Sequence, residues 1–201
     1  MTEDDDLTLL ERWRRGDAAA GQALFRRHFE SVYGFFVTKC PAEADELVQG
    51  TFMACLRQRD QFRGDSSFRT YMFAIARNQL YGALTARQKA NARLDYAVSS
   101  IAQLVTTPGT QLARNEEHRQ LVEALRTLPV EQQTLLELHY WQDLEIGQLA
   151  EIFEMNAAAI RQRLHRARKA LRDQVERSAP PSALENLESM DVWVKGFAPR
   201  N

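Results

Sequence analysis

The segment 61–78, QFRGDSSFRTYMFAIARN, combines aromatic rings, cations and an amide around a short polar loop. An amphipathic helix of a soluble bundle usually separates its apolar face from its charges, and this segment mixes them. Rings that stack on bases, together with arginines that hold phosphates, are typical of sites for single-stranded nucleic acid. The segment therefore predicts a site that can hold unstacked bases.

Part of this segment also has the spacing of a helix core. Phe68, Met72 and Ile75 recur at intervals of four and three residues, which predicts a buried stripe. Tyr71 lies off that stripe and is the better candidate for contact with a base. The preceding loop, 63–66, predicts a small polar pocket for a base taken out of the stack, and Asn78 can hydrogen-bond a base edge.

A second candidate site lies in residues 145–171, EIGQLAEIFEMNAAAIRQRLHRARKAL. The spacing predicts two short helices and a tight turn, with Asn156 capping the second helix. The apolar stripe of that second helix consists of Ile160, Leu164, Ala167 and Leu171. Its other faces are basic, as in a helix-turn-helix whose second helix fits the major groove. A solvated basic helix in an ordinary bundle is the alternative explanation.

The charge distribution allows two such surfaces although the total charge does not suggest them. The 201 residues carry 26 Lys and Arg against 27 Asp and Glu, a formal net charge of −1. Acidic residues gather at 3–6 and 43–46, whereas basic residues gather at 57–93 and 161–172. Such polarisation along the chain matters more for nucleic-acid contact than the sum of the charges.

Several other classes of protein are disfavoured. No run of about eighteen apolar residues predicts a membrane span, and the acidic N-terminus does not resemble a secretory signal. Cys40 and Cys55 fit neither a disulfide framework nor a zinc site, so we expect a reduced, cytoplasmic chain. No nucleophile–base pair, metal-ligand spacing or phosphate-binding loop is visible, so neither an enzyme nor a bound cofactor is predicted.

The elements that must position these residues are helices. We expect a bundle over roughly 5–90, with helix starts at Asp6, Asp17, Pro41 and Ser66 or Ser67. Residues 94–113 lose helical periodicity and are predicted to form a linker. A second helical unit is expected from about Arg114 to Arg177, and the Pro-broken end of the chain is predicted to be a tail.

Four of these stretches resemble a known family. QFRGDSSFRTYMFAIARNQL is similar to region 2 of the sigma-70 family, in its small extracytoplasmic-function (ECF) group, and EADELVQGTF resembles the acidic helix of that group. LRTLPVEQQTLLELHYWQDLEIGQLAEIFEMN resembles the start of sigma region 4, and AAAIRQRLHRARKAL resembles its recognition helix. The resemblance covers about 10–90 and 118–175, in the order and spacing of the family.

The resemblance implies an all-α fold of two small helical domains, a region 2 four-helix bundle and a region 4 helix-turn-helix, joined by a flexible linker. The implied limits are 1–93 for region 2, 94–113 for the linker, 114–177 for region 4 and 178–201 for the tail. The implied function is a sigma initiation factor that binds bacterial core RNA polymerase, directs it to promoters and promotes DNA melting. An anti-sigma factor or another regulator is a further implied partner.

Carried over residue by residue, the resemblance implies three contact sets. Contact with core polymerase would come from Asp45, Glu46, Leu47, Gln49 and Phe52. The melted, single-stranded −10 element would be held by Arg63, Asp65, Ser66, Ser67, Phe68, Arg69, Tyr71, Arg77 and Asn78. The duplex −35 element would be read by Asn156, Ala157, Ala159, Arg161, Gln162, Arg163, His165, Arg166 and Arg168.

The sequence departs from the family pattern within the helix-turn-helix, among other positions. Glu154 stands where the helix-turn-helix turn usually has Gly, so the turn needs a less favourable backbone. Residues 157–159 are all Ala, which removes a hydroxyl often found at the start of the recognition helix. Direct reading would then fall to Arg161, Gln162 and Arg163, or depend on DNA shape. The alternatives are a helix-turn-helix regulator that does not engage polymerase, and an enzyme or interaction bundle.

Overall fold

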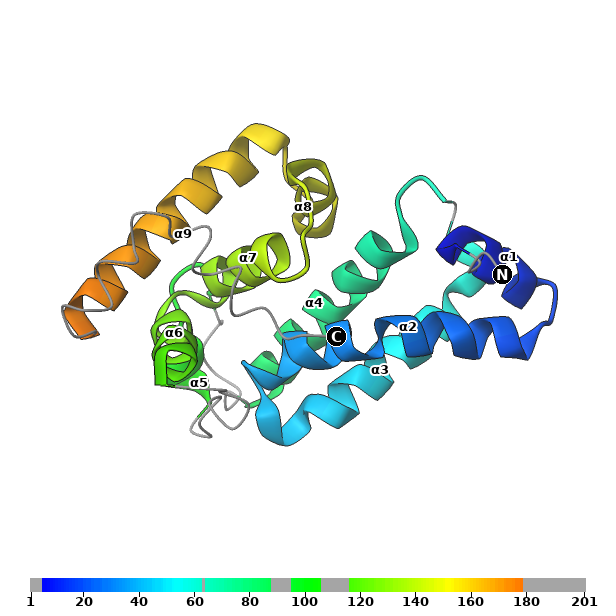
Figure 1. Cartoon of the computed structure of the whole chain (residues 1–201), viewed down its shortest axis with the longest axis horizontal. Coiled ribbons are helices and arrows are strands. Elements are labelled where there is room, and N and C mark those ends of the chain that lie inside the picture. Colours follow the sequence, from blue (N-terminus) through cyan, green and yellow to red (C-terminus); the bar gives the residue numbers. More distant parts are fainter. Residues whose placement is uncertain (1–4, 63, 88–94, 106–115, 179–201) are drawn as a thin grey trace.

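The computed structural model describes residues 5–62, 64–87, 95–105 and 116–178 (Figure 1). The first half contains α1 (Asp6–Arg14), α2 (Ala18–Val37), η1 (Pro41–Glu43), α3 (Ala44–Arg57), η2 (Arg59–Gln61) and α4 (Phe68–Arg87). The second half contains α5 (Ile101–Leu104), α6 (Glu116–Thr127), α7 (Val130–Tyr140), α8 (Ile146–Phe153) and α9 (Ala157–Ser178). The described residues include no β-strand beyond one isolated bridge, so the predicted all-α class is confirmed.

Polar side chains start two of the helices where the sequence predicts them. The carboxylate of Asp17 accepts a hydrogen bond from the backbone N–H of Ala20 at 3.1 Å and caps α2. The hydroxyl of Ser67 accepts from the N–H of Thr70 at 3.0 Å and caps α4. Each cap satisfies a backbone donor that the first turn of a helix leaves without an intrahelical partner.

The cap of α1 differs from the prediction by one residue. Asp5, not Asp6, accepts a hydrogen bond from the N–H of Thr8, at 2.7 Å. Asp6 points instead to α2, where its two carboxylate oxygens meet Arg27 at 2.8 Å and His28 at 2.7 Å. Tertiary partners therefore decide which of two adjacent carboxylates becomes the cap.

Helices α1–α4 pack around an aromatic core. Phe35 of α2 meets Phe73 of α4 edge-on, with ring centroids 5.8 Å apart. Trp13 of α1 packs directly on the backbone of α2 at Gly21, where an added Cβ would lie 2.6 Å from the indole ring. Helix α3 packs against both α2 and α4. The predicted four-helix bundle is confirmed.

Helices α6–α9 form the second unit. The stripe predicted on α9 is buried along its length, at Ile160, Leu164, Ala167 and Leu171. It packs against α6, α7 and α8. Burial of this stripe fixes the rotation of α9, because the other faces of the helix must then point to solvent or to the flanks of its neighbours.

The described part of the predicted linker, 95–105, is packed against the second unit. Ile101 and Val105 are buried, and the N–H of Val130 donates to the carbonyl of Ser99 at 2.9 Å. Two apolar anchors and backbone hydrogen bonds hold this stretch, which includes the short helix α5 although its sequence lacks helical periodicity. Residue 94 and residues 106–113 of the predicted linker, and tail residues 179–201, lie outside the described residues.

Both cysteines are buried free thiols. Burial raises the pKa of Cys55 to about 12 and also raises the pKa of Cys40, so both thiols are protonated at neutral pH. Within the described part of the chain, no helix combines the length and the apolar character that a membrane crossing requires.

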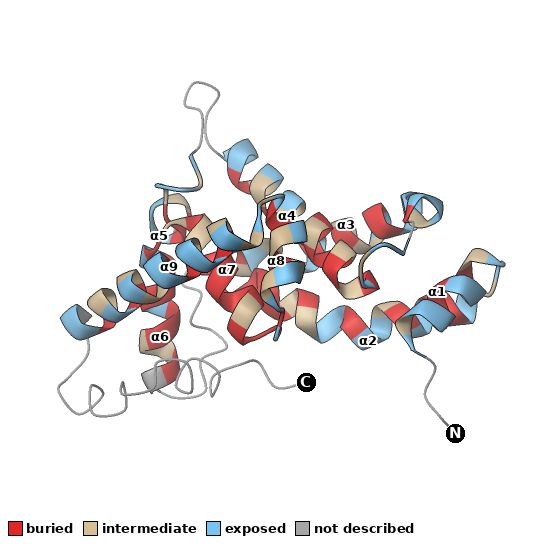
Figure 2. Ribbon diagram, turned by 90° about the horizontal axis from the view of Figure 1, so that it is seen from above, coloured by how far each residue is buried: buried red, intermediate tan, exposed pale blue. Residues whose placement is uncertain are grey.

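The two helical units touch each other. Helix α4 of the first unit packs against α8 of the second, and α8 in turn packs against α9 (Figure 1). Figure 2 shows that α7, with its many buried residues, lies near the middle of the molecule, whereas α9 presents exposed residues outward. The contact between α4 and α8 matters for the site, because α4 carries predicted DNA contacts.

Candidate nucleic-acid interface

The outer face of α9 is a free basic surface. Arg161, Gln162, His165 and Arg166 are exposed, and none of them makes a hydrogen bond or ion pair to another side chain among the described residues. Their side chains are available to an external partner. Arginine and glutamine at such positions can form bidentate hydrogen bonds to base edges in a major groove.

Three other residues of the set predicted to read the duplex contact other residues of the second unit. Asn156 accepts a hydrogen bond from the N–H of Ala159 at 2.8 Å, so its side chain caps α9. Arg163 pairs with Glu131 of α7. Arg168 donates to the hydroxyl of Tyr140 and lies 5.5 Å over that ring.

Helical geometry explains why these side chains have partners within the unit. Arg163 lies three residues after Ile160 and one before Leu164, so it flanks the buried stripe, and its side chain reaches α7. Arg168 likewise lies four residues after Leu164. The stripe itself was the signal that could have separated these two arginines from the outward ones. Ala157 and Ala159 are half-buried at the start of α9 and carry no polar group.

The turn before α9 has the unfavourable backbone that the sequence predicts. Glu154 adopts the left-handed conformation, with φ 55° and ψ 44°. Its N–H donates to the carbonyls of Ala150 and Glu151, which closes the end of α8. A side chain at this conformation costs free energy that Gly would not. The tight turn is nevertheless formed, and it sets α9 against α8.

The segment 64–71 presents a polar loop backed by aromatic rings. Asp65 and Ser67 are exposed and Ser66 is half-buried, whereas Arg63 lies outside the described residues. Tyr71 is half-buried against Phe62, with centroids 4.8 Å apart, and its hydroxyl donates to Gln58 at 3.3 Å.

Phe68, a member of the predicted single-strand set, is buried. Its side chain is only 2% exposed and contacts the rings of Phe62, Tyr71 and His28. In this structure it therefore packs beneath the loop, as the spacing of Phe68, Met72 and Ile75 already indicated.

Two arginines of the same set face the second unit. Arg77 donates to the carbonyl of Ile152 at the end of α8 and lies 5.2 Å over the ring of Phe153. Arg69 donates to the side chain of Gln142 at 3.1 Å, and burial lowers its pKa. Asn78 is exposed. Among the described residues, the predicted single-strand surface is thus open at the loop and at Asn78, whereas Arg69 and Arg77 are half-buried and contact the second unit.

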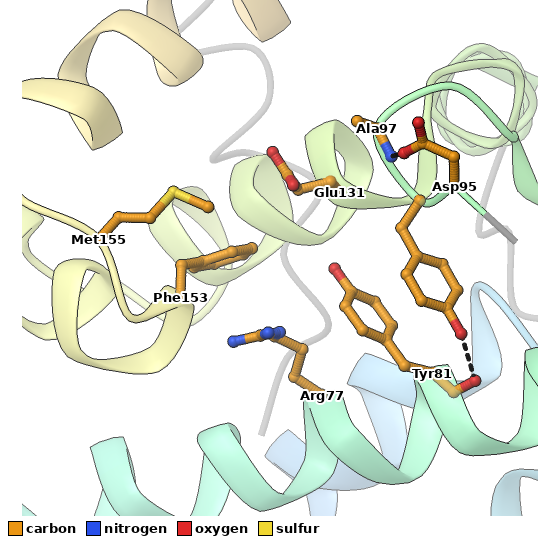
Figure 3. Close-up of a pocket in the computed structure, with 8 residues that line it drawn as sticks. Arg77, Tyr81, Asp95, Ala97, Glu131, Phe153 and Met155 are labelled. Carbon is orange, nitrogen blue, oxygen red and sulfur yellow. Dashed lines mark hydrogen bonds between the residues drawn. The ribbon is translucent and has the colours of Figure 1, made fainter. Parts of the chain in front are cut away.

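A hollow of about 580 Å³ lies beside this contact, where α4, the turn at 95–97, α7 and α8 meet (Figure 3). Tyr81 of α4 stacks on Tyr96 with centroids 3.9 Å apart, and the Tyr96 hydroxyl donates to the Tyr81 carbonyl at 2.6 Å. Glu131, on the opposite wall, donates its backbone N–H to the carbonyl of Tyr96 at 3.0 Å. Tyr96 therefore joins the two units at the edge of the hollow.

The third predicted surface lies on α3. Asp45, Glu46 and Gln49 are exposed, and Phe52 is half-buried in a stack on Phe25 with centroids 4.8 Å apart. Leu47, which was predicted in the same set, is only 8% exposed and belongs to the core, because it points to the inner side of α3.

Sequence reasoning missed the apolar part of this surface. Phe29, Met53 and Leu56 are exposed by about two-fifths each, at 40%, 43% and 41%. Of these three residues, Phe29 lines a hollow of about 380 Å³ together with Phe25 and Phe52. Met53 and Leu56, three residues apart and off the buried stripe of α3, were the available signal. Carboxylates beside exposed apolar side chains suit a basic, amphipathic partner surface.

Sequence comparison finds the same two segments. The family described as "Sigma-70 region 2" matches residues 24–90, and "Sigma-70, region 4" matches residues 118–171. An "ECF RNA polymerase sigma-E factor" of Haemophilus influenzae is 28% identical over 181 residues, which are 85% of this chain and 95% of the relative. An "RNA polymerase sigma-H factor" of Pseudomonas aeruginosa is 26% identical, over 85% of this chain and 94% of the relative.

Two solved structures share the fold. CnrH in complex with the cytosolic domain of CnrY matches 88% of this chain and 100% of that chain, with a TM-score of 0.64 and 20% identity. RpoE in complex with the anti-sigma factor NepR, from Bartonella quintana, matches 81% of this chain and 99% of that chain, with a TM-score of 0.58 and 19% identity. Because each match covers more than four-fifths of this chain, it includes residues of both helical units.

Proposed function

This chain belongs to the sigma-70 family, in its ECF group, and we propose that its three exposed surfaces divide promoter recognition between the two helical units. As a sigma factor it directs RNA polymerase to promoters for transcription initiation. The proposal concerns which residues perform each part: α9 for the −35 element, the loop before α4 for the −10 element, and α3 for core polymerase.

The free face of α9 carries the proposal for the −35 element. Arg161, Gln162, His165 and Arg166 project from one side of a helix that is held rigidly by its buried stripe. Rigid support matters because base reading requires side chains at fixed positions in the groove. Arg161 and Gln162 supply the base-edge hydrogen bonds, and Arg166 contacts phosphate.

The loop 64–67, Tyr71 and Asn78 form the proposed −10 surface. Ser66, Ser67 and Asp65 offer hydrogen-bonding groups to a base that has left the duplex stack, and Tyr71 offers a ring face. Arg69 and Arg77 complete this surface by holding phosphates once they are released from Gln142 and from the end of α8.

The α3 surface is the proposed site for core polymerase. Asp45, Glu46 and Gln49 give it a polar edge, and Phe52 and Leu56 give it an apolar centre. An interface with an apolar centre and charged rim gains affinity from the centre and orientation from the rim. The chain works where polymerase works, in the cytoplasm, and contributes binding energy to initiation without a reaction of its own.

A regulatory protein is a further proposed partner. CnrH and the Bartonella RpoE were both solved in complex with another protein, which in the second case is named as an anti-sigma factor. By analogy, a partner of that class would bind this chain and compete with polymerase or DNA.

Charge reversal on α3 tests the proposed function. The double variant Asp45→Lys, Glu46→Lys should lose co-elution with core RNA polymerase in gel filtration, because it opposes the complementary charge of the partner. A charge-matched control, Glu11→Lys with Glu176→Lys, changes exposed residues outside α3 and should bind like wild type. Retained binding by the α3 variant would move the docking surface elsewhere. A folded wild-type chain that never binds core polymerase would favour a DNA-binding regulator that does not engage it.

A further inference from the structure

The hollow where α4, the turn at 95–97, α7 and α8 meet has the size of a site for a small molecule. Its volume is about 580 Å³, and pockets for small molecules span about 300–1,000 Å³. The three surfaces of the proposed function leave this hollow unused, although Arg77 borders both it and the −10 surface. The groups that line the hollow therefore decide what it can bind.

Two buried donors that border the hollow lack partners among the described residues. They are the hydroxyl of Tyr81 and the Nε of Arg77. Burial also raises the pKa of Tyr81, so its hydroxyl keeps its proton at neutral pH. A buried donor without an acceptor costs free energy, and few such groups occur in folded proteins. Acceptor atoms on a bound molecule would recover this cost at both groups.

Neighbouring rings hold the two donors in position. The Arg77 guanidinium lies 5.1 Å from the ring centroid of Tyr81 and 5.2 Å from that of Phe153. The Tyr81 ring in turn stacks on Tyr96. Figure 3 shows the Tyr81 hydroxyl directed into the hollow, toward the wall that carries Glu131. Donors that are already in place add to affinity, because little conformational freedom is lost when a ligand binds.

Two carboxylates border the hollow away from Arg77. Glu131 of α7 and Asp95 of the turn are both lining residues (Figure 3). Glu131 pairs with Arg163, and Asp95 accepts a hydrogen bond from the N–H of Ala97 at 2.9 Å. Each carboxylate is thus held in place, and a carboxylate has two oxygens that can accept several hydrogen bonds. A ligand that reaches this wall must offer donors to it.

The space between the donors and the carboxylates has flat, apolar walls. The rings of Tyr81, Tyr96 and Phe153 and the side chain of Met155 line it. Aromatic side chains pack well on the faces of planar molecules, and nucleobases stack on them in many complexes. The complementary ligand is therefore planar, accepts hydrogen bonds along one edge and donates them along another.

Guanine has this arrangement of groups. Its O6 and N7 are acceptors on one edge, and its ring N–H and amino group are donors on another. Adenine has a donor beside N7 and presents a ring acceptor where guanine has the ring N–H, so it would set an acceptor against the carboxylates. We propose that the hollow binds a guanine base, with O6 and N7 accepting from Tyr81 and Arg77 and the ring N–H and amino group donating to Glu131. The base can belong to a free nucleoside or nucleotide, or to a strand of nucleic acid.

NMR spectra of the full chain, with carbon-13 in the methionine methyl groups, test the site. The chain has five methionines, of which Met155 lines the hollow and Met53 is exposed on α3. The variant Met155→Leu identifies the Met155 resonance by its absence. Guanosine should shift this resonance with a Kd on the order of 0.1 mM, as expected for a ligand of about 20 non-hydrogen atoms, and should leave that of Met53 unchanged.

Changes in the ligand and in the protein test the two edges separately. Inosine lacks the amino group of guanosine and should bind about tenfold more weakly, because the carboxylate wall loses a donor. Tyr81→Phe removes only a hydroxyl that has no partner among the described residues, so the fold is kept and guanosine should bind about tenfold more weakly. Tyr33→Phe, which removes a hydroxyl from α2 away from the hollow, is the matched control and should bind like wild type.

A short oligo-dT strand with one central dG, compared with oligo-dT alone, identifies the source of the base. A Met155 response to the dG strand at lower concentration than to guanosine would support a base from a strand, and the reverse order would support a free nucleoside or nucleotide.

Three outcomes would overturn the proposal: a Met155 resonance that neither guanosine nor the dG strand shifts, equal affinity for guanosine and inosine, or unchanged affinity in Tyr81→Phe. None of them bears on polymerase binding, which the α3 variants test separately.

Discussion

Arg163 of α9 pairs with Glu131 of α7, whereas Arg161 on the same helix is exposed and forms no ion pair within the described part of the chain. Two residues of one type, two positions apart, thus have different roles. Arg163 helps to hold α9 on its own unit. Arg161 is left for an external partner, and this difference can be measured.

Arg161→Ala should weaken binding to the −35 duplex, whereas Arg163→Ala should chiefly lower stability. If Arg161 contacts a phosphate, its loss reduces the slope of log affinity against log salt by about 1. If it contacts a base, its loss costs about 1–3 kcal/mol and relaxes the sequence preference. Arg163→Ala leaves Glu131 half-buried without its cation and should lower the thermal midpoint. Titrations over several salt concentrations, on a promoter fragment mapped from transcript ends, separate the two effects.

The opposite pattern, with a salt slope that falls only in Arg163→Ala, would show that the reading face of α9 includes the flank toward α7.

Glu154→Gly should stabilise the chain by about 1 kcal/mol. The residue holds φ 55°, a conformation that costs a side chain free energy but costs Gly little. Glu151→Gly is the matched control, since it places the same substitution at an exposed helical position of α8, where Gly lowers stability by about 1 kcal/mol. Urea unfolding monitored by circular dichroism gives both values. A loss of stability in both variants would mean that Glu154 makes a contact that outweighs its backbone cost.

Gly21→Ala and Gly82→Ala should change stability in opposite directions. At Gly21 a Cβ would lie 2.6 Å from the Trp13 ring, so the buried indole must shift, at a cost of about 1–3 kcal/mol. At Gly82 the exposed side of α4 offers nothing within 4 Å, and Ala should add about 0.5–1 kcal/mol of helix stability. Thermal unfolding measures both variants. Equal gains would show that α1 leaves α2 readily, because Trp13 would then move without cost.

Local patterns in the sequence were enough to predict the helices and the helix-turn-helix. The buried stripe of α9, from Ile160 to Leu171, follows directly from its spacing. The unfavourable turn at Glu154 follows from the residue type. Such features depend only on residues within one or two helical turns. These residues are also close together in the sequence, so the pattern can be recognised there.

Contacts between the units could not be predicted in the same way. Lys39 and Glu137 are 98 positions apart, and Arg77 and Ile152 are 75 apart. No periodicity relates such residues, and a lysine or arginine in a basic region is equally compatible with solvent, DNA or a buried partner. Their pairing depends on how the two helical units pack on each other, which is decided only when both units are folded.

The ion pairs of Asp6 predict an acid-sensitive contact between α1 and α2. Partial burial acts to raise the pKa of Asp6, but hydrogen bonds from His28 and Arg27 outweigh it and hold the pKa below its ordinary value of 3.8. A carboxylate with a depressed pKa in the folded state stabilises the fold above its ordinary value, and this contribution is lost as the pH falls through the depressed one. Asp6→Asn should therefore cost about 1–2 kcal/mol at neutral pH and progressively less below pH 3.8. Urea unfolding of both proteins across this range measures the difference, and a difference that stays constant in acid would show that the hydrogen bonds of Asp6, and not its charge, hold α1 in place.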